Sequence, residues 1–261
     1  MGDCRRLEML PAVTDGVIDS GASAEGGDAD GRFTRSAAAW TLGVAGLMAY
    51  NWWVLIPLKP GLMRSPNELF SNLEVTGQPY AAAMQHADLL AGLLLLGAFL
   101  AAGSNSLAGA RREWLGLVTF ATACGIGGIF PQVCDDGLSP ACMSQEWHFR
   151  LDPSQYLHDA AGVTEFAAIT IVLLLASRRT RDDQATASRT YRHLVLAAFV
   201  AYPLLGLAYL TNILGSVIEA AFFVGFTVIV VTQLAERTRA TSSQPTRLGG
   251  RMRGQRWLGR S

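Results

Sequence analysis

The chain has 261 residues, of which 50% are hydrophobic and only 16% are charged. A soluble globular domain carries about 25% charged residues, so this composition argues against a soluble protein and indicates lipid as the solvent. The formal net charge is zero, but it combines an acidic N-terminal segment with an arginine-rich C-terminal segment. The position of charge is therefore more informative than its sum.

The two ends of the chain differ in composition from its centre. Residues 1–36 are rich in Gly, Asp, Ser and Ala and contain no apolar run long enough for the core of a signal peptide. We expect them to form a disordered cytoplasmic arm. Residues 236–261 form a basic cytoplasmic tail that we also expect to be disordered, and residues 37–235 form the predicted transmembrane domain.

Long apolar segments fill this central region. A helix rises about 1.5 Å per residue, so roughly 20 apolar residues are needed to cross a hydrocarbon core of about 30 Å. Four segments satisfy this requirement: Ala37 to Leu58, Leu89 to Ala110, Trp114 to Val133, and His158 to Ser177. The first three contain no charge, and the fourth carries Glu165 in its interior.

The last apolar stretch is long enough for two spans. Residues 194–235 contain Glu219 as their only charge, and as one helix they would extend about 63 Å, twice the hydrocarbon core. They must therefore fold back, and Asn212 and Gly215 suit a turn within 210–215. Pro203 then falls inside the fifth span as a kink. The sequence predicts an all-α integral membrane protein with a six-transmembrane-helix bundle.

Arginine and lysine near span ends collect on the cytoplasmic side of a membrane. Arg32 and Arg35 lie just before the first span, two arginines join spans two and three, five join spans four and five, and seven follow the sixth. The opposite side has only Lys59, Arg64 and Arg150. This asymmetry predicts that both the N-terminus and the C-terminus are cytoplasmic, with two substantial outer loops at 59–87 and 134–157.

Cys134 and Cys142 lie in the second of these outer loops. The outer side of a cell membrane is oxidising, which favours a disulfide between them. A bridge there would hold the loop as a lid over the bundle. A metal site is the less favoured alternative, with these nearby side chains as further ligands: Asp135, Asp136, His148 and His158.

Ionisable groups inside spans are costly and usually face the bundle interior, so each suggests a functional site. Glu165 and Glu219 are the deepest acids, and His158 lies seven residues before Glu165, on the same helical face. Asp88 and Asn51 are also expected toward the outer leaflet. We expect Asn51, Asp88, His158, Glu165 and Glu219 to line a polar ligand-binding pocket that opens outward. The alternative is that Glu165 and Glu219 are protonated or singly hydrogen-bonded and serve only to join neighbouring helices.

Short motifs in residues 37–234 resemble the bacterial and archaeal membrane proteins grouped as "domain of unknown function 998". They are Ile129-Phe130-Pro131, the cysteine pair that follows, Leu157-His158-Asp159, and the segment from Glu68 to Leu73. Where the family pattern has an acid directly before the first cysteine, this chain has Val133. The resemblance implies six helices and a cysteine-bearing outer loop in a bacterial plasma membrane, and implies no activity.

Three functions remain open. We expect a non-enzymatic protein that binds a small solute or lipid in the polar pocket, with no catalytic residue, cofactor or metal. The alternatives are a structural or sensory component without a ligand, and a hydrolase in which His86, His158 and nearby carboxylates hold a metal. The expected partner is the lipid bilayer, with anionic lipid near the basic tail. We expect no nucleic acid, because membrane topology already explains the tail arginines.

Overall fold

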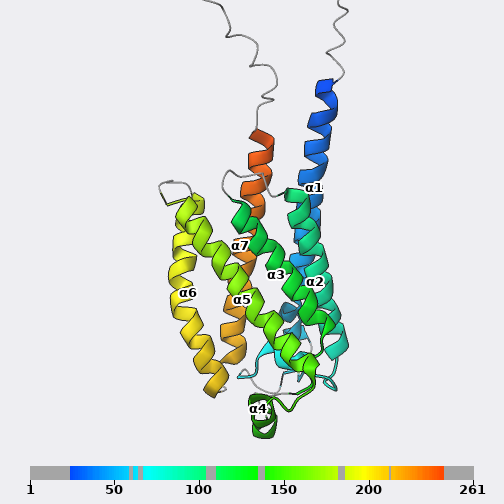
Figure 1. The fold of residues 1–261 in the computed structure, drawn as a ribbon, viewed down its shortest axis with the longest axis vertical. Helices are drawn as coiled ribbons and strands as arrows, with labels where there is room; N and C mark the ends of the chain where they lie inside the picture. Colours follow the sequence, from blue (N-terminus) through cyan, green and yellow to red (C-terminus); the bar gives the residue numbers. More distant parts are fainter. Residues whose placement is uncertain are drawn as a thin grey trace, which may run out of the picture.

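The computed structural model describes residues 24–58, 61–63, 67–103, 110–134, 139–181, 186–211 and 213–243, and these ranges contain helices and loops but no strand. The all-α prediction is therefore confirmed (Figure 1). The long helices are α1 (Ala24–Tyr50), α2 (Ala81–Ala102), α3 (Arg111–Ile129), α5 (Pro153–Arg179), α6 (Thr186–Thr211) and α7 (Gly215–Ser243). The short ones are η2 (Trp52–Leu58), η3 (Phe70–Glu74) and α4 (Pro140–Trp147).

The apolar helices make this a membrane protein. Among the described residues, four helices are long and apolar enough to cross a bilayer, namely α2, α5, residues 188–207 of α6, and residues 215–240 of α7. A fifth candidate consists of residues 33–50 of α1 together with η2, which are bent by 46° relative to each other. The predicted fold-back within residues 194–235 is confirmed, because α6 ends at Thr211 and α7 begins at Gly215.

The helix α3 corresponds to the predicted third span but is not among these candidates. Its 19 residues begin with Arg111, Arg112 and Glu113 and include four glycines, so its mean hydropathy is low. It is nevertheless a full member of the bundle, since it packs against α2 on one side and α5 on the other. The six long helices form a closed ring, in which each packs against the next along the chain and α7 returns to α1.

Two helices extend beyond the predicted transmembrane domain. The first turns of α1 begin at Ala24, within the segment expected to be a disordered arm, and α7 continues to Ser243, within the expected tail. The start of α1 and the end of α7 lie at the same end of the bundle, which we call the termini end (Figure 1). The opposite end carries α4, and we call it the α4 end. Residues 1–23 and 244–261 lie outside the described residues.

Glycines bring the backbones of α2 and α3 into direct contact. A Cβ atom added at Gly92 would meet backbone atoms of Ala121 and Gly125, and one added at Gly128 would meet backbone atoms of Gln85 and Leu89. Small residues permit such close approach of membrane helices. The contact explains why glycines are frequent in α3, which packs closely along α2.

Replacing Gly92 with alanine should therefore force α2 and α3 apart. We expect Gly92→Ala to destabilise the protein by about 1–3 kcal/mol, the usual range for overpacking, and to lower its thermal midpoint in detergent. Gly162→Ala in α5 is the matched control, because no atom lies within 4 Å of a Cβ at that position. Equal midpoints for the two variants would contradict the interpretation of the contact.

Candidate functional site

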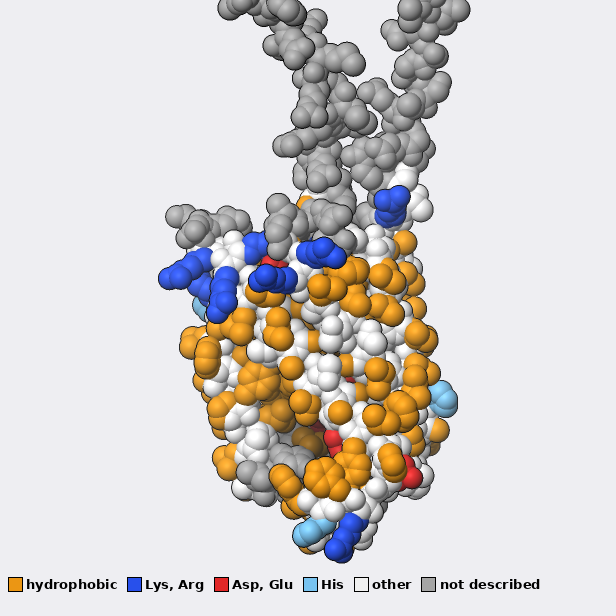
Figure 2. Space-filling model, in the orientation of Figure 1, with side chains coloured by type: hydrophobic (Ala, Val, Ile, Leu, Met, Phe, Trp, Pro, Cys, Tyr) orange, Lys and Arg blue, Asp and Glu red, His pale blue; other side chains and the backbone are white. Residues whose placement is uncertain are grey.

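A cavity of about 500 Å³ lies toward the α4 end, bounded by η3 and by the helices α1 to α7. Figure 2 shows a hollow in this half of the molecule with acidic side chains beside it. Six carboxyl side chains line the cavity: Glu74, Asp88, Glu146, Asp159, Glu165 and Glu219. The described lining residues include His158 but neither lysine nor arginine.

Neighbouring donors hold several of these carboxyls in place. The indole nitrogen of Trp52 donates to Asp88 Oδ1 at 3.0 Å. The backbone N–H of Phe70 in η3 donates to Glu219 Oε2. Gln155 Nε2 donates to Asp159 Oδ1 at 3.3 Å, one helical turn away on α5. Asp88 and Glu219 are thus held by groups from other segments, and Asp159 is held from within its own helix.

His158 is oriented by the end of α3. Its Nδ1 lies 3.2 Å from the carbonyl oxygen of Gly127 and 3.1 Å from that of Phe130. A carbonyl oxygen can only accept a hydrogen bond, so Nδ1 carries the proton in this arrangement. The other ring nitrogen, Nε2, is then the acceptor of the neutral side chain.

Three buried oxygens that line the cavity accept no hydrogen bond from the protein. They are Asn72 Oδ1, Glu74 Oε2 and Gln132 Oε1, and each residue is no more than 5% exposed. Buried polar atoms in folded proteins are nearly always paired, because an unpaired one costs free energy. These oxygens give the cavity an excess of hydrogen-bond acceptors over donors.

Aromatic side chains form much of the remaining wall, contributed by Tyr50, Phe166, Phe222, Phe223 and Phe226. They contact one another edge to face, with ring centroids 5.0 Å apart for Tyr50 and Phe223 and 5.1 Å for Phe166 and Phe226. The face of an aromatic ring attracts cations. Carboxyls and rings together make a surface suited to positive charge.

The structure brings together four of the five ligand-binding residues predicted from sequence. Asp88, His158, Glu165 and Glu219 line this one cavity. Asn51 does not line it, because its amide donates to Thr227 Oγ1 at 3.0 Å and to the Leu47 carbonyl at 2.8 Å, tying α1 to α7. Whether the four residues bind a ligand stays a prediction.

Sequence reasoning missed Asn72, Glu74 and Gln132. The first two lie in η3 and the third follows α3, where no helical periodicity indicates which side chains face inward. Gln85 Nε2 donates to the Glu74 carbonyl at 2.7 Å, and Thr76 donates through both N–H and hydroxyl to the Gln132 carbonyl. These bonds hold η3 against α2 and the end of α3. The sequence feature that could have indicated these site residues was the group of polar residues that precedes the second span.

Cys134 and Cys142 lie at disulfide distance, with their Cα atoms 5.9 Å apart. Cys142 belongs to α4, whose first turn is capped by Ser139 Oγ accepting from the Cys142 N–H at 3.2 Å. The backbone N–H of Val133 donates to Gln155 Oε1 at 2.9 Å, which ties the same segment to α5. The pair thus attaches α4, which carries the cavity residue Glu146, to the end of α3.

A second polar cluster lies at the termini end. Arg179 pairs with Glu113 at 2.8 Å and with Glu236 at 2.6 Å, and Gln233 Nε2 donates to Glu113 Oε2 at 3.2 Å. The cluster links α3, α5 and α7. From sequence, Arg179 and Arg237 were only counted as charges that set topology, because the partner acids lie far away along the chain.

Arg237 is fully buried, with 0% of its surface exposed. Its guanidinium donates to Gln233 Oε1 at 3.2 Å and to the backbone carbonyls of Gly103 and Ala110 at 3.4 and 3.3 Å. These carbonyls lie at the end of α2 and the start of α3. One side chain of α7 therefore binds both the end of α2 and the start of α3.

The hydrolase alternative required His86 and His158 to hold one metal. His86 is exposed and is not among the residues that line the cavity. Within the described ranges, no three His, Cys, Asp or Glu side chains are grouped so that they could hold a metal ion. The described geometry thus gives this alternative no specific support.

The pKa of Glu74 is raised well above its ordinary value of 4.5. The main cause is burial, followed by the nearby charge of Asp88 and a hydrogen bond between the Glu74 and Asp88 carboxyls. The folded protein therefore keeps a proton that the unfolded chain releases, and folding stability should fall as pH rises above about 4.5 toward the raised value. Glu74→Gln mimics the protonated side chain, so its stability should depend less on pH.

Thermal unfolding between about pH 5 and about pH 8 would measure this difference. Asp152→Asn is the matched control, because Asp152 is exposed at the N-cap of α5 and asparagine also caps helices. If Glu74→Gln and the unaltered protein lose stability in parallel, the assignment of the proton to Glu74 is wrong.

The chain was compared with known proteins by sequence and by structure. Searches of curated proteins and of solved structures each found no match. A family model described as "Protein of unknown function (DUF998)" matches residues 43–236, which confirms the resemblance inferred from the short motifs. The chain belongs to this family of proteins of unknown function.

Proposed function

We propose that the protein binds a small organic cation in the cavity at its α4 end. The observation that carries the proposal is the lining itself, in which six carboxyl side chains and five aromatic rings surround one space of about 500 Å³. This volume suits a small ligand. Unpaired acceptor oxygens on Asn72, Glu74 and Gln132 add partners for an ammonium or hydroxyl group of such a ligand.

The physical argument rests on charge balance. Several carboxyls that share a poorly solvated space repel one another when ionised, and they either take up protons or gather a cation. An organic cation would neutralise them while its alkyl groups contact the faces of Phe222, Phe223 and Tyr50. An anion would meet only repulsion from the same wall.

Binding of tetramethylammonium tests this function directly. With the full chain in lipid nanodiscs, we expect saturable binding by calorimetry, and Glu165→Gln and Glu219→Gln should each weaken it about tenfold by removing a carboxylate from the wall. Asp152→Asn, which changes an exposed acid at the start of α5, should leave the affinity unchanged. Both cavity variants should still accumulate as folded protein.

The alternative that these acids only join helices predicts different results. Under that alternative, the unaltered protein shows no saturable binding and the two glutamine variants lose thermal stability instead. Absence of saturable binding by the unaltered protein would overturn the proposed function.

We also propose that six helices span a cell membrane with both termini in the cytoplasm, so that the cavity faces outward. Two features support this orientation. The start of α1 and the end of α7 share one end of the bundle (Figure 1), and arginine side chains gather there (Figure 2), as expected for a cytoplasmic side. The helix α3 would be the sixth span, sheltered by α2 and α5. The tail expected to attract anionic lipid lies largely outside the described residues.

Reporter fusions test the orientation. A reporter after Arg260 and one inserted within residues 182–185, between α5 and α6, should both be active only as cytoplasmic fusions. A reporter inserted within residues 135–138, between the paired cysteines, should be active only as an external fusion. External activity of either of the first two reporters would contradict the proposed orientation.

A further inference from the structure

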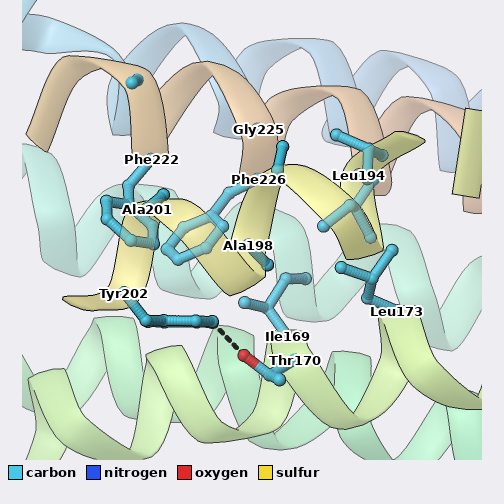
Figure 3. A pocket seen from close by; sticks show the side chains of 13 residues that line it. Ile169, Thr170, Leu173, Leu194, Ala198, Ala201, Tyr202, Phe222, Gly225 and Phe226 are labelled. Carbon is cyan, nitrogen blue, oxygen red and sulfur yellow. Dashed lines mark hydrogen bonds between the residues drawn. The ribbon is translucent and has the colours of Figure 1, made fainter. Parts of the chain in front are cut away.

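A second cavity of about 70 Å³ lies among α5, α6 and α7. Its wall is largely aliphatic, with Ile169, Leu173, Leu194, Ala198, Gly225 and Ile229 around it (Figure 3). Two hydroxyl groups also reach the wall, from Thr170 and Tyr202, but they hydrogen-bond to each other across the interface of α5 and α6. The wall therefore offers an apolar surface whose polar atoms are already paired.

The apolar cavity adjoins the acidic one. Phe222 and Phe226 line both spaces, and Phe166 of the acidic cavity packs against both of these rings and against Tyr202 of the apolar cavity. Along α7, Glu219, Phe222, Phe226 and Ile229 follow each other at intervals of three and four residues, which places them on one face of the helix. From Glu219 to Ile229 this face extends about 15 Å. One continuous surface thus passes from carboxyls through aromatic rings to aliphatic side chains.

Both cavities reach the outer surface of the bundle on the side formed by α5, α6 and α7. Ala197 and Ala221 belong to the apolar cavity, and Val163 and Gly206 to the acidic one, and all four are exposed. The apolar window of α6 is the least enclosed of the candidate spans, with 6% of it buried. A surface of this kind on an apolar helix faces lipid rather than water.

We propose that the natural ligand is a single-chain amphiphile with a cationic ammonium headgroup, and that it enters from the bilayer. The headgroup occupies the acidic cavity, and the alkyl chain passes Phe222 and Phe226 into the apolar cavity. This inference rests on the proposed function, because it assumes that the acidic cavity binds a cation. Charge complementarity decides the class of amphiphile, since a phosphate headgroup would meet the carboxyls of Asp88, Glu165 and Glu219.

Two probes that share a headgroup separate the two cavities. Tetramethylammonium has no chain, whereas decyltrimethylammonium adds one, and binding of each to the full chain in nanodiscs is measured with empty nanodiscs subtracted to remove partitioning. Burial of the chain should make decyltrimethylammonium bind at least about tenfold more tightly. Decanoate, which has a similar chain and an anionic headgroup, should not compete.

Gly225→Leu should prevent binding of the ligand's alkyl chain without affecting binding of its ammonium headgroup. Gly225 lines the apolar cavity but not the acidic one, and no atom lies within 4 Å of a Cβ at this position, so a leucine side chain can start into the apolar space. We expect the variant to lower the affinity for decyltrimethylammonium about tenfold or more and to leave the affinity for tetramethylammonium unchanged. Val224→Leu, at a neighbouring exposed position that lines neither cavity, should change neither affinity.

The possible outcomes distinguish failure of the alkyl-chain site from failure of the proposed cation-binding function. If tetramethylammonium binds but the chain adds no affinity, or if Gly225→Leu weakens both probes equally, the tail site is wrong while the cation site stands. If decanoate competes as well as the cation, the headgroup class is wrong. If neither cation binds to the unaltered protein, the proposed function fails together with the inference.

Discussion

Direct backbone contact between α2 and α3 is the constraint on which the rest of the bundle depends. Because Gly92, Gly125 and Gly128 place no side chain between the helices, α2 approaches closely enough for the Cys124 thiol to donate to the Asp88 carbonyl at 3.3 Å. This hydrogen bond fixes the position of Asp88 along the C-terminal part of α3. The same turn offers the Gly127 and Phe130 carbonyls that orient His158. The C-terminal part of α3 therefore helps to position two of the cavity's titratable groups.

The two ends of the bundle treat buried charge differently. At the termini end, Glu113 and Glu236 each pair with Arg179, and neutral donors and acceptors complete the cluster. Around the cavity, the described lining residues combine carboxyls with aromatic rings and a single histidine. Buried charges are stable when they are paired. The first arrangement is complete within the protein, whereas the second suits a positive charge supplied by another molecule.

The sequence was sufficient for those features that depend on local composition. Apolar length predicted where helices lie, and the fold-back before Gly215 followed from the excess length of the last stretch. Spacing on one helix placed His158 and Glu165 on the same face, and both line the cavity. The cysteine pair followed from its location in one short loop, and the two residues lie at disulfide distance.

Features that depend on tertiary contacts could not be predicted in the same way. Asn51 is polar and near the expected depth, but a hydroxyl on α7 satisfies its amide, and no local pattern indicates that partner. Glu74 enters the wall because η3 folds against α2. The helix α3 has a low hydropathy but packs along α2 and α5, and a window of hydropathy does not measure such packing.

The burial of Arg237 bears on the order in which the molecule is assembled. A polypeptide emerges from its N-terminus, so α2 and α3 are made long before α7. Until α7 is in place, the Gly103 and Ala110 carbonyls lack the guanidinium that later binds them. These two contacts therefore form only after α7 has been made. The ends of two earlier helices are thus held by a side chain that follows them by 134 and 127 residues.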